Sequence, residues 1–274
     1  TIDLGGGADN ANVSSTAPGP GGVLTGIAVA LFLEGGEGVD ALHVDASGDL
    51  GGLTGRMSVA RLEGLGMSAA GMGYSAFESL GLALGSGADD FTVAGTHSGT
   101  TQVSTNGEAD HVLVTEVDGA TTVNTGAGAD TVDVEVKAAD SSDPSSIVGL
   151  LTVNGGSESD TLDVYSGSIL DETGNLTSTT ITGLGMGAGI VYADIQELNV
   201  NLGSGGDTFT IVNTHRGATN LDTGAGHDQV TLENNDGVTL IAAAAGDDTV
   251  TVLANGAATT IEGGDDEDTV NVRT

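Results

Sequence analysis

Apolar and polar residues alternate along this chain in short runs, and most of these runs follow a glycine-rich turn that ends on an aspartate. The segment 125–136 reads "TGAGADTVDVEV": two glycines precede Asp130, and polar and apolar residues alternate after it. A period of two residues is typical of a strand with one buried face. The segment therefore predicts a glycine turn followed directly by a strand, with Val132 inside and Thr131 on the surface.

The same pattern recurs ten times. The aspartates that end the turns are Asp9, Asp40, Asp89, Asp110, Asp130, Asp160, Asp207, Asp228, Asp248 and Asp268. In all ten copies the residues seven before, two after and four after the aspartate are apolar. Each repeat therefore predicts an apolar strand, a glycine turn, an aspartate and a second strand with two inward residues.

The spacing of the aspartates predicts the architecture. From Asp89 onward their positions increase in steps of 21, 20, 30, 47, 21, 20 and 20, and the two earlier steps are 31 and 49. A unit of about 20 residues holds two short strands and two turns, which is one coil of a solenoid. The longer steps fit either one coil with a bulging loop or two coils of which one lacks the motif. We expect an all-β parallel β-solenoid of the β-roll kind, with about twelve coils and a length of roughly 60 Å at ~4.8 Å per coil.

A longer period lies over the short one. Asp9 and Asp130 are 121 residues apart, and Asp89 and Asp207 are 118 apart. The segments "GLGMSAAGMGY" (64–74) and "GLGMGAGIVY" (183–192) match at this distance. We expect one continuous solenoid over 1–274, duplicated as blocks of approximately 1–121 and 122–239 with a partial third block, 240–274. Duplicated blocks favour an extensible rod over a single active site.

Composition narrows the classes of partner. The chain has 39 acidic and 5 basic residues, for a net charge of −34, which argues against nucleic acid and anionic membranes as partners. Such a charge opposes compaction unless cations neutralise it.

Cysteine and tryptophan are absent, so disulfides and thiolate metal sites are excluded and the core must be thin and aliphatic. The most apolar run, 22–33, is too short to span a bilayer, so we expect no membrane insertion. Because the chain begins with Thr1 rather than Met, we expect it to be part of a longer protein.

The glycine turns resemble a known calcium-binding repeat. "GGEGVDALH" (35–43) fits the nine-residue G-G-x-G-x-D-x-U-x pattern of the RTX, or haemolysin-type, family of large bacterial secreted and surface proteins. The resemblance implies Ca²⁺ at the turns, with the ten aspartates as its ligands. Two departures are visible. The first glycine is kept only at Gly35, Gly155 and Gly263. We also expect one such turn per coil of about 20 residues, all on one edge, where the family has turns on both edges.

The chemistry of the turn leaves two alternatives open. Calcium takes six to eight oxygen ligands from carboxylates and carbonyls, so an ion between stacked turns would join adjacent coils. Alternatively, each aspartate caps backbone N–H groups without a metal. The best-spaced candidates for calcium are Asp89, Asp110, Asp130, Asp207, Asp228, Asp248 and Asp268. The acidic run 265–268 fits either a cation site or a solvated end.

Other residues carry weaker signals. His97 and His215 recur at the 118-residue period, which favours turn residues over catalytic ones. Tyr74 and Tyr192 also match between blocks, and we expect them to pack under the longer loops. No HExxH, GxSxG or P-loop motif occurs and basic residues are few, so the chain is not expected to be an enzyme.

These observations support one main functional hypothesis. The chain is expected to be a calcium-stiffened structural rod or filament segment of a large secreted or surface-attached bacterial protein, located outside the cell or on its surface. Its partners would be further copies or flanking repeats, stacked head to tail. The alternative is an adhesin module whose longer loops bind extracellular polysaccharide or a cell surface.

Overall fold

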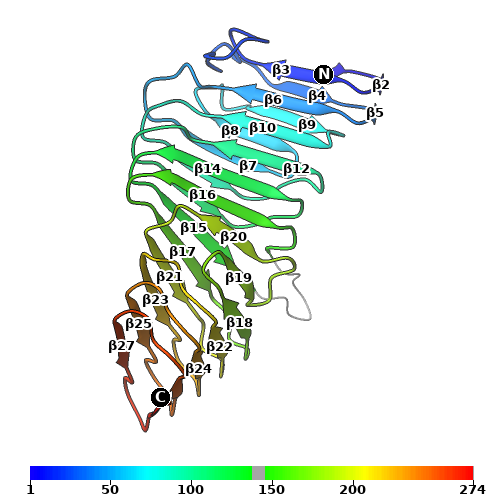
Figure 1. Ribbon diagram of the computed structural model, residues 1–274. Helices are drawn as coiled ribbons and strands as arrows, with labels where there is room; N and C mark the ends of the chain where they lie inside the picture. The colour runs from blue at the N-terminus through cyan, green and yellow to red at the C-terminus, as the bar shows by residue number, and fades with distance from the viewer. Residues whose placement is uncertain (138–145, 274) are drawn as a thin grey trace.

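The computed structural model describes residues 1–137 and 146–273, and within them the chain forms two long sheets that run side by side from the N-terminal to the C-terminal end (Figure 1). Each sheet has thirteen strands, and a small third sheet pairs β2 (Gly6–Gly7) with β5 (Glu37–Gly38). The described residues form no helix, and so none that could cross a membrane. The predicted all-β parallel solenoid is confirmed.

Each sheet is built from strands of successive coils in spatial order. The first sheet contains β1 (Ile2–Asp3), β4 (Leu31–Glu34), β9 (Met72–Ser75), β8 (Arg61–Gly64), β7 (Thr54–Ser58), β11 (Asp90–Val93), β13 (His111–Val114), β15 (Thr131–Val136), β17 (Thr161–Ser166), β21 (Glu197–Asn201), β23 (Ala218–Asp222), β25 (Thr239–Ala242) and β27 (Thr259–Glu262). The second sheet contains β28 (Thr269–Val272), β26 (Thr249–Val252), β24 (Gln229–Leu232), β22 (Thr208–Ile211), β18 (Thr173–Leu176), β19 (Thr180–Gly183), β20 (Ile190–Ala193), β16 (Leu151–Ser157), β14 (Thr121–Ala127), β12 (Thr100–Ser104), β10 (Ser79–Ala83), β6 (Ala41–Asp45) and β3 (Asn10–Val13).

Successive coils stack with equivalent residues directly in register. Val112 of β13 pairs with Phe91 of β11 on one side and with Val132 of β15 on the other. Stacking in register places like residues in rows, and the inward rows of the two sheets form one continuous core. Val132 is 1% exposed while Thr131 is only partly buried, so the predicted strand phase is confirmed.

The predicted core positions are buried in the inner coils and exposed at the two ends. Leu42, Val103 and Leu162 have no exposed surface. At the ends, Ile2 is 50% exposed and Val272 is 66% exposed, although both occupy inward rows. The terminal coils are therefore stacked on one side only, and the cost of leaving such an aliphatic side chain exposed is about 1.5–3 kcal/mol of transfer free energy.

Two antiparallel meanders interrupt the parallel stacking. In the first sheet β8 lies antiparallel between β7 and β9, and in the second sheet β19 lies antiparallel between β18 and β20. β8 and β19 end at Gly64 and Gly183, both with positive φ, where an added Cβ would overlap a carbonyl oxygen of the neighbouring strand. These meanders occupy the two longest aspartate steps, so neither alternative considered for those steps is correct. In the two intermediate steps, Asp9 to Asp40 and Asp130 to Asp160, the described residues hold a single coil, with one strand in each sheet, which is the first of the two alternatives.

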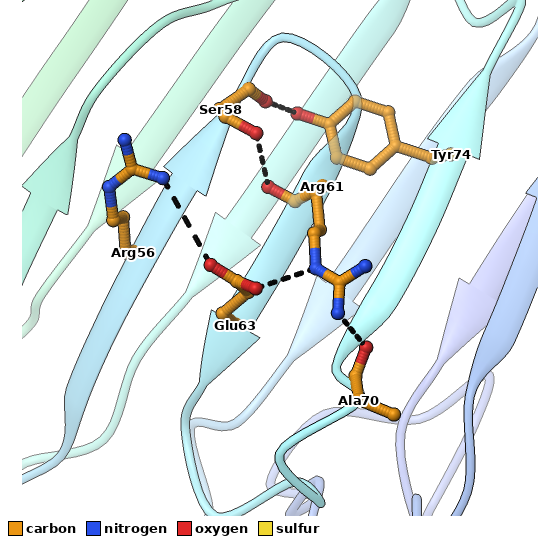
Figure 2. A network of polar contacts seen from close by, with 6 residues as sticks. All are labelled: Arg56, Ser58, Arg61, Glu63, Ala70 and Tyr74. Atoms are coloured by element: carbon orange, nitrogen blue, oxygen red, sulfur yellow. Dashed lines mark hydrogen bonds and ion pairs between the residues drawn. The ribbon is translucent and has the colours of Figure 1, made fainter.

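The first meander contains Arg56 of β7 and Arg61 of β8, two of the chain's five Lys and Arg residues. Figure 2 shows Arg61 of β8 with its Nε 2.6 Å from Oε1 of Glu63, while its terminal nitrogen donates to the carbonyl of Ala70. The hydroxyl of Tyr74 donates to the carbonyl of Ser58 at 2.5 Å (Figure 2). In the second meander the Tyr192 hydroxyl donates to a carbonyl in the same way, at 2.7 Å. Both tyrosines are 2% exposed, so their predicted packing role is confirmed.

The meanders exchange the roles of the two sheets. Before the first meander, the strand that precedes the glycine turn lies in the first sheet and the strand that follows it lies in the second, as with β4 and β6. Between the meanders this order is reversed, as with β14 and β15, and after the second meander it is restored, as with β23 and β24. Because the strands of each sheet other than β8 and β19 run parallel, the turns from the first to the second sheet lie on one edge and the return turns on the other. The expectation that all glycine turns lie on one edge is therefore wrong.

Candidate functional site: three aspartate ladders

The ten predicted aspartates form three columns, one for each segment between meanders. The first ladder contains Asp9 and Asp40. The second ladder, on the opposite edge, contains Asp89, Asp110, Asp130 and Asp160. The third ladder, back on the first edge, contains Asp207, Asp228, Asp248 and Asp268. The eight aspartates from Asp40 to Asp248 are 1–3% exposed, whereas Asp9 is partly buried and Asp268 is exposed. The whole acidic run 265–268 is exposed.

One oxygen of each stacked carboxylate caps the backbone of the coil before it. The N–H of Asp89 donates to Oδ1 of Asp110 at 2.7 Å, and the N–H of Asp110 donates to Oδ1 of Asp130 at 2.8 Å. In the third ladder the N–H of Asp228 donates to Oδ1 of Asp248 at 2.8 Å. An aspartate that follows a turn can reach this N–H because equivalent residues of adjacent coils are only ~4.8 Å apart. The capping that the metal-free alternative predicts is thus present.

Two residues that sequence reasoning missed close the ladders. The N–H of Asp40 donates to Oε2 of Glu78 at 2.6 Å, and the N–H of Asp160 donates to Oε1 of Gln196 at 2.6 Å. Glu78 and Gln196 lie next to the meanders. The coil that follows there has no glycine turn on that edge, so Glu78 or Gln196 accepts the hydrogen bond that an aspartate accepts elsewhere. They lie 118 residues apart, in "FESL" and "IQEL", and this match was the signal that could have found them.

The other carboxylate oxygen has no hydrogen-bond partner. Within the described part of the chain, Oδ2 is buried and unpartnered in nine of the ten aspartates, all except Asp268. Leaving a buried polar atom without a partner costs about 1–3 kcal/mol, and more when the group is charged. Native proteins pair almost all such groups, so nine exceptions at equivalent positions mark these oxygens as candidate ligands for water or a cation.

Several ladder aspartates have raised pKa values. Burial raises the pKa of Asp110 to about 6, and the neighbouring charges of Asp130 and Asp89 act in the same direction. Burial likewise raises the pKa of Asp207 to about 6. The pKa values of Asp89 and Asp160 are also raised, again mainly by burial. The second and third ladders therefore contain carboxylates that gain free energy from binding a proton or a cation.

The glycine turns bring backbone carbonyls close to this column. Gly126 and Gly128 have φ values of 103° and 142°, and a Cβ on either residue would overlap the carbonyl oxygen of the turn stacked on it. Only glycine allows these turns to stack so closely. At Gly155 an added Cβ would overlap the carbonyl oxygen of Asp194 and lie 2.7 Å from Oδ2 of Asp160. At this turn a carbonyl and a free carboxylate oxygen thus face the same small space, which the absent side chain keeps open.

The donor set fits a hard cation such as calcium, with one restriction. In the described residues, no three acidic or histidine side chains gather at a common point. An ion at a ladder would therefore take Oδ2 atoms as its charged ligands and backbone carbonyls or water as the rest, which are all oxygen ligands that calcium accepts. The residue five before the aspartate is glycine at Asp40, Asp160 and Asp268, and Leu, Thr or Ala in the other coils.

The repeated histidines lie in connecting turns, as predicted. His97 lies between β11 and β12, and its Nδ1 accepts a hydrogen bond from the N–H of Gly99 at 2.9 Å. His215 lies between β22 and β23, where its ring meets that of Tyr192 edge to face at 6.0 Å. Burial lowers the pKa of both histidines.

The comparisons with known proteins do not identify a family. No protein-family model matches this chain, and no curated protein is similar to it at a significant level.

Proposed function

We propose that this chain is a structural β-solenoid segment whose aspartate ladders bind calcium. The observation that carries the proposal is the column of buried Oδ2 atoms without a partner, repeated at nine of the ten aspartates in the described chain. Asp89, Asp110, Asp130 and Asp160 would supply the charged ligands of the second ladder, and the stacked glycine turns would supply carbonyls. The bound cation would neutralise the column and hold adjacent coils together.

Calcium is favoured over a proton as the working partner at neutral pH. Two carboxylates one coil apart, at ~4.8 Å, repel each other by about 3.5 kcal/mol at an effective dielectric constant of 20. A proton relieves this only near or below the raised pKa, whereas a divalent cation relieves it at any higher pH. The proposed location is outside the cell or on its surface, in a large bacterial protein that resembles the RTX family. Extracellular calcium-binding modules have dissociation constants of about 10⁻⁴–10⁻³ M, which sets the calcium concentration for the test.

The mechanical role rests on the shape and the ends of the stack. The described chain is one unbroken pair of thirteen-stranded sheets, and its terminal coils expose Ile2, Val270 and Val272, which belong to inward rows. A further coil, from flanking repeats or from another copy stacked head to tail, would bury these residues. Such a contact is heterologous and propagates into a filament. The proposed role involves no catalysis.

Thermal unfolding with and without calcium tests this proposal. We expect the melting temperature, followed by circular dichroism, to rise in millimolar calcium and to fall when EGTA is added, because only the folded chain presents the ladders. Magnesium at the same ionic strength is the control, since it is smaller and demands near-octahedral geometry. A melting temperature that is unmoved by calcium would leave the aspartates as backbone caps alone.

Sedimentation velocity tests the head-to-tail contact separately. With calcium present we expect species larger than the monomer to increase with protein concentration. Val270→Asp and Val272→Asp, which place charges on the exposed terminal coil, should return the chain to a monomer. A chain that remains monomeric at high concentration would exclude stacking between copies.

A second candidate function, an adhesin module that binds carbohydrate or a cell surface through its longer loops, is favoured by a groove beneath the loop of residues 14–22.

A further inference from the structure

A cavity of about 500 Å³ lies on the outer face of the second sheet near its N-terminal end. Its floor is β10, whose outward residues Gly81 and Ala83 are too small to cover the strand. Its sides are His43 of β6 and Gln102 of β12, which stand in the same outward row as Gly81. The loop 14–22 closes one end. We call this cavity the trough.

Asp45 holds the loop over the trough. Its Oδ2 accepts a hydrogen bond from the N–H of Gly22 at 3.0 Å, and its Oδ1 accepts one from the N–H of Ser47 at 3.0 Å. Asp45 is the one carboxylate among the lining residues, all of which lie in the described chain, and both of its oxygens are engaged. The trough therefore presents no free acidic group, on a chain whose net charge is −34.

The duplicated block shows that this opening is particular to the first copy. The strand registers align two outward rows position by position: Asn12, His43, Gly81, Gln102 and Thr122 in the first copy, and Asp133, Asp163, Asn199, Asn220 and Leu240 in the second. In the second copy the central place is filled. Nδ2 of Asn199 donates to Oδ1 of Asp163 at 2.6 Å, and Nδ2 of Asn220 donates to Oδ1 of Asn199 at 2.7 Å.

The same replacement occurs one outward position along the strand. Ala83 in the first copy corresponds to Asn201 in the second, 118 residues later. Two side chains that cover the sheet in one block are thus reduced to a hydrogen and a methyl group in the other. Because neighbouring strands are ~4.8 Å apart, the backbones of β6 and β12 lie roughly 9–10 Å apart, and the side chains of His43 and Gln102 narrow the opening between them.

The lining determines the class of ligand. His43, Gln102 and Ser104 offer an imidazole, an amide and a hydroxyl, which between them can donate and accept hydrogen bonds without carrying a fixed charge. The loop adds apolar C–H surface from Pro18 and Pro20. Ligands with many hydroxyls and apolar ring faces match this mixture, and anionic ligands are repelled by the acidic chain.

We propose that the trough binds a neutral saccharide, with hydroxyls paired to His43, Gln102 and Ser104 and a ring face against the loop. This site rests on the second candidate function and gives it a place and a ligand class. It uses none of the ladder aspartates, so calcium-dependent stability and saccharide binding can fail separately.

Saturation-transfer NMR on the whole chain tests the site. The probes are neutral disaccharides of glucose, galactose and mannose at millimolar concentration, with glucuronic acid as the anionic comparison. We expect transfer to at least one neutral disaccharide and none to glucuronic acid. Absence of binding by all the neutral probes would overturn the proposal while leaving the calcium proposal intact.

The decisive variant is the double substitution Gly81→Asn and Ala83→Asn, which introduces the second copy's own residues. Gly81 has an ordinary φ, and a Cβ there would meet only Nδ1 of His43, at 3.3 Å, so the strand accepts the change when this exposed imidazole moves by a few tenths of an ångström. We expect the affinity to fall by at least about tenfold. Thr122→Asn is the matched control, because it adds the same side chain to the same row outside the trough and should bind like the parent chain. Unchanged binding in the double variant, or an equal loss in the control, would show that the ligand lies elsewhere.

Discussion

The substitution Asp110→Asn separates the two roles of a ladder carboxylate. Asparagine keeps an oxygen that can accept the hydrogen bond from the N–H of Asp89, now 2.7 Å long, but it removes the charge from the free side of the group. Asp110 lies in the middle of the second ladder and is 3% exposed, so its environment is close to that of every inner aspartate.

The magnitude follows from the raised pKa. Burial raises the pKa of Asp110 from 3.8 to about 6, and each pKa unit corresponds to about 1.4 kcal/mol. Above pH 6 and without a cation, the ionised Asp110 therefore destabilises the folded chain by up to about 3 kcal/mol. Asparagine removes this cost but puts a buried NH₂ group in place of the unpartnered oxygen, and a buried donor without a partner costs about 1–3 kcal/mol. The net expectation in EGTA is a change between zero and about 2 kcal/mol in favour of the variant.

Calcium should reverse the order. The parent chain is expected to gain free energy of unfolding in millimolar calcium, while Asp110→Asn should gain less because one charged ligand of the column is lost. Urea unfolding at about pH 7.5, well above the raised pKa, measures both values in EGTA and in calcium. The informative quantity is the difference between the two calcium effects, since it cancels the cost of the buried NH₂ group.

Asp118→Asn is the matched control. Asp118 lies in the other turn of the same coil, is exposed, and undergoes the same change of charge away from any ladder. Its calcium effect should equal that of the parent chain. If both variants lost the same amount of calcium stabilisation, calcium would be acting by general screening of the −34 charge rather than at the ladders. If Asp110→Asn lost several kcal/mol of unfolding free energy in EGTA, Oδ2 of Asp110 would have a partner in the folded chain, and the reasoning would be refuted.

Three further outcomes are expected from the structure. Val132→Asp buries an unpaired carboxylate and should lower the free energy of unfolding in urea by more than about 4 kcal/mol, whereas Thr131→Asp should lower it by about 1 kcal/mol or less. Equal losses would contradict the strand phase. In EGTA, Asp110→Asn should lose less stability than the parent chain between pH 5 and pH 7.5, because Asp110 with its raised pKa binds a proton in the folded state that the unfolded chain binds only below about 4. The comparison cancels the opposite contribution of the buried His97 and His215, and equal losses in the two chains would contradict the raised pKa of Asp110. Gly128→Ala should lower the free energy of unfolding by at least about 2 kcal/mol, because φ is 142° and the methyl group would overlap the carbonyl of Glu108. Gly167→Ala is the control and should be nearly neutral, since an added Cβ there meets nothing within 4 Å.

Most of the coil could be predicted from the sequence, because its determinants are local. Alternation after Asp130 fixed which side of the strand faces inward, and the apolar residue seven before each aspartate fixed the strand on the other side of the turn. Burial of Val123, Val132 and Val134 follows from that period alone. The same locality made the aspartates visible as the ends of turns that can stack.

The tertiary structure alone decided which edge each turn occupies. In each meander the middle strand, which ends at Gly64 or Gly183, runs antiparallel between two parallel ones, and it shifts the stacking by half a coil. Local spacing does not encode that shift, because a strand before a turn and a strand after it present the same alternating pattern to their neighbours. For this reason one expected ladder became three on two edges, with Glu78 and Gln196 closing two of them.

The trough shows the same division. Gly81 is an ordinary glycine in a strand when read in sequence, and its match with Asn199 is visible only as one difference among many between the two blocks. Stacking places it between His43 and Gln102, 38 residues before and 21 after it, and only there does a missing side chain become an opening. The sequence determined the period and the inward faces because these depend on neighbours along the chain. The structure decided the edges, the ladder ends and the trough because these depend on which coil lies against which.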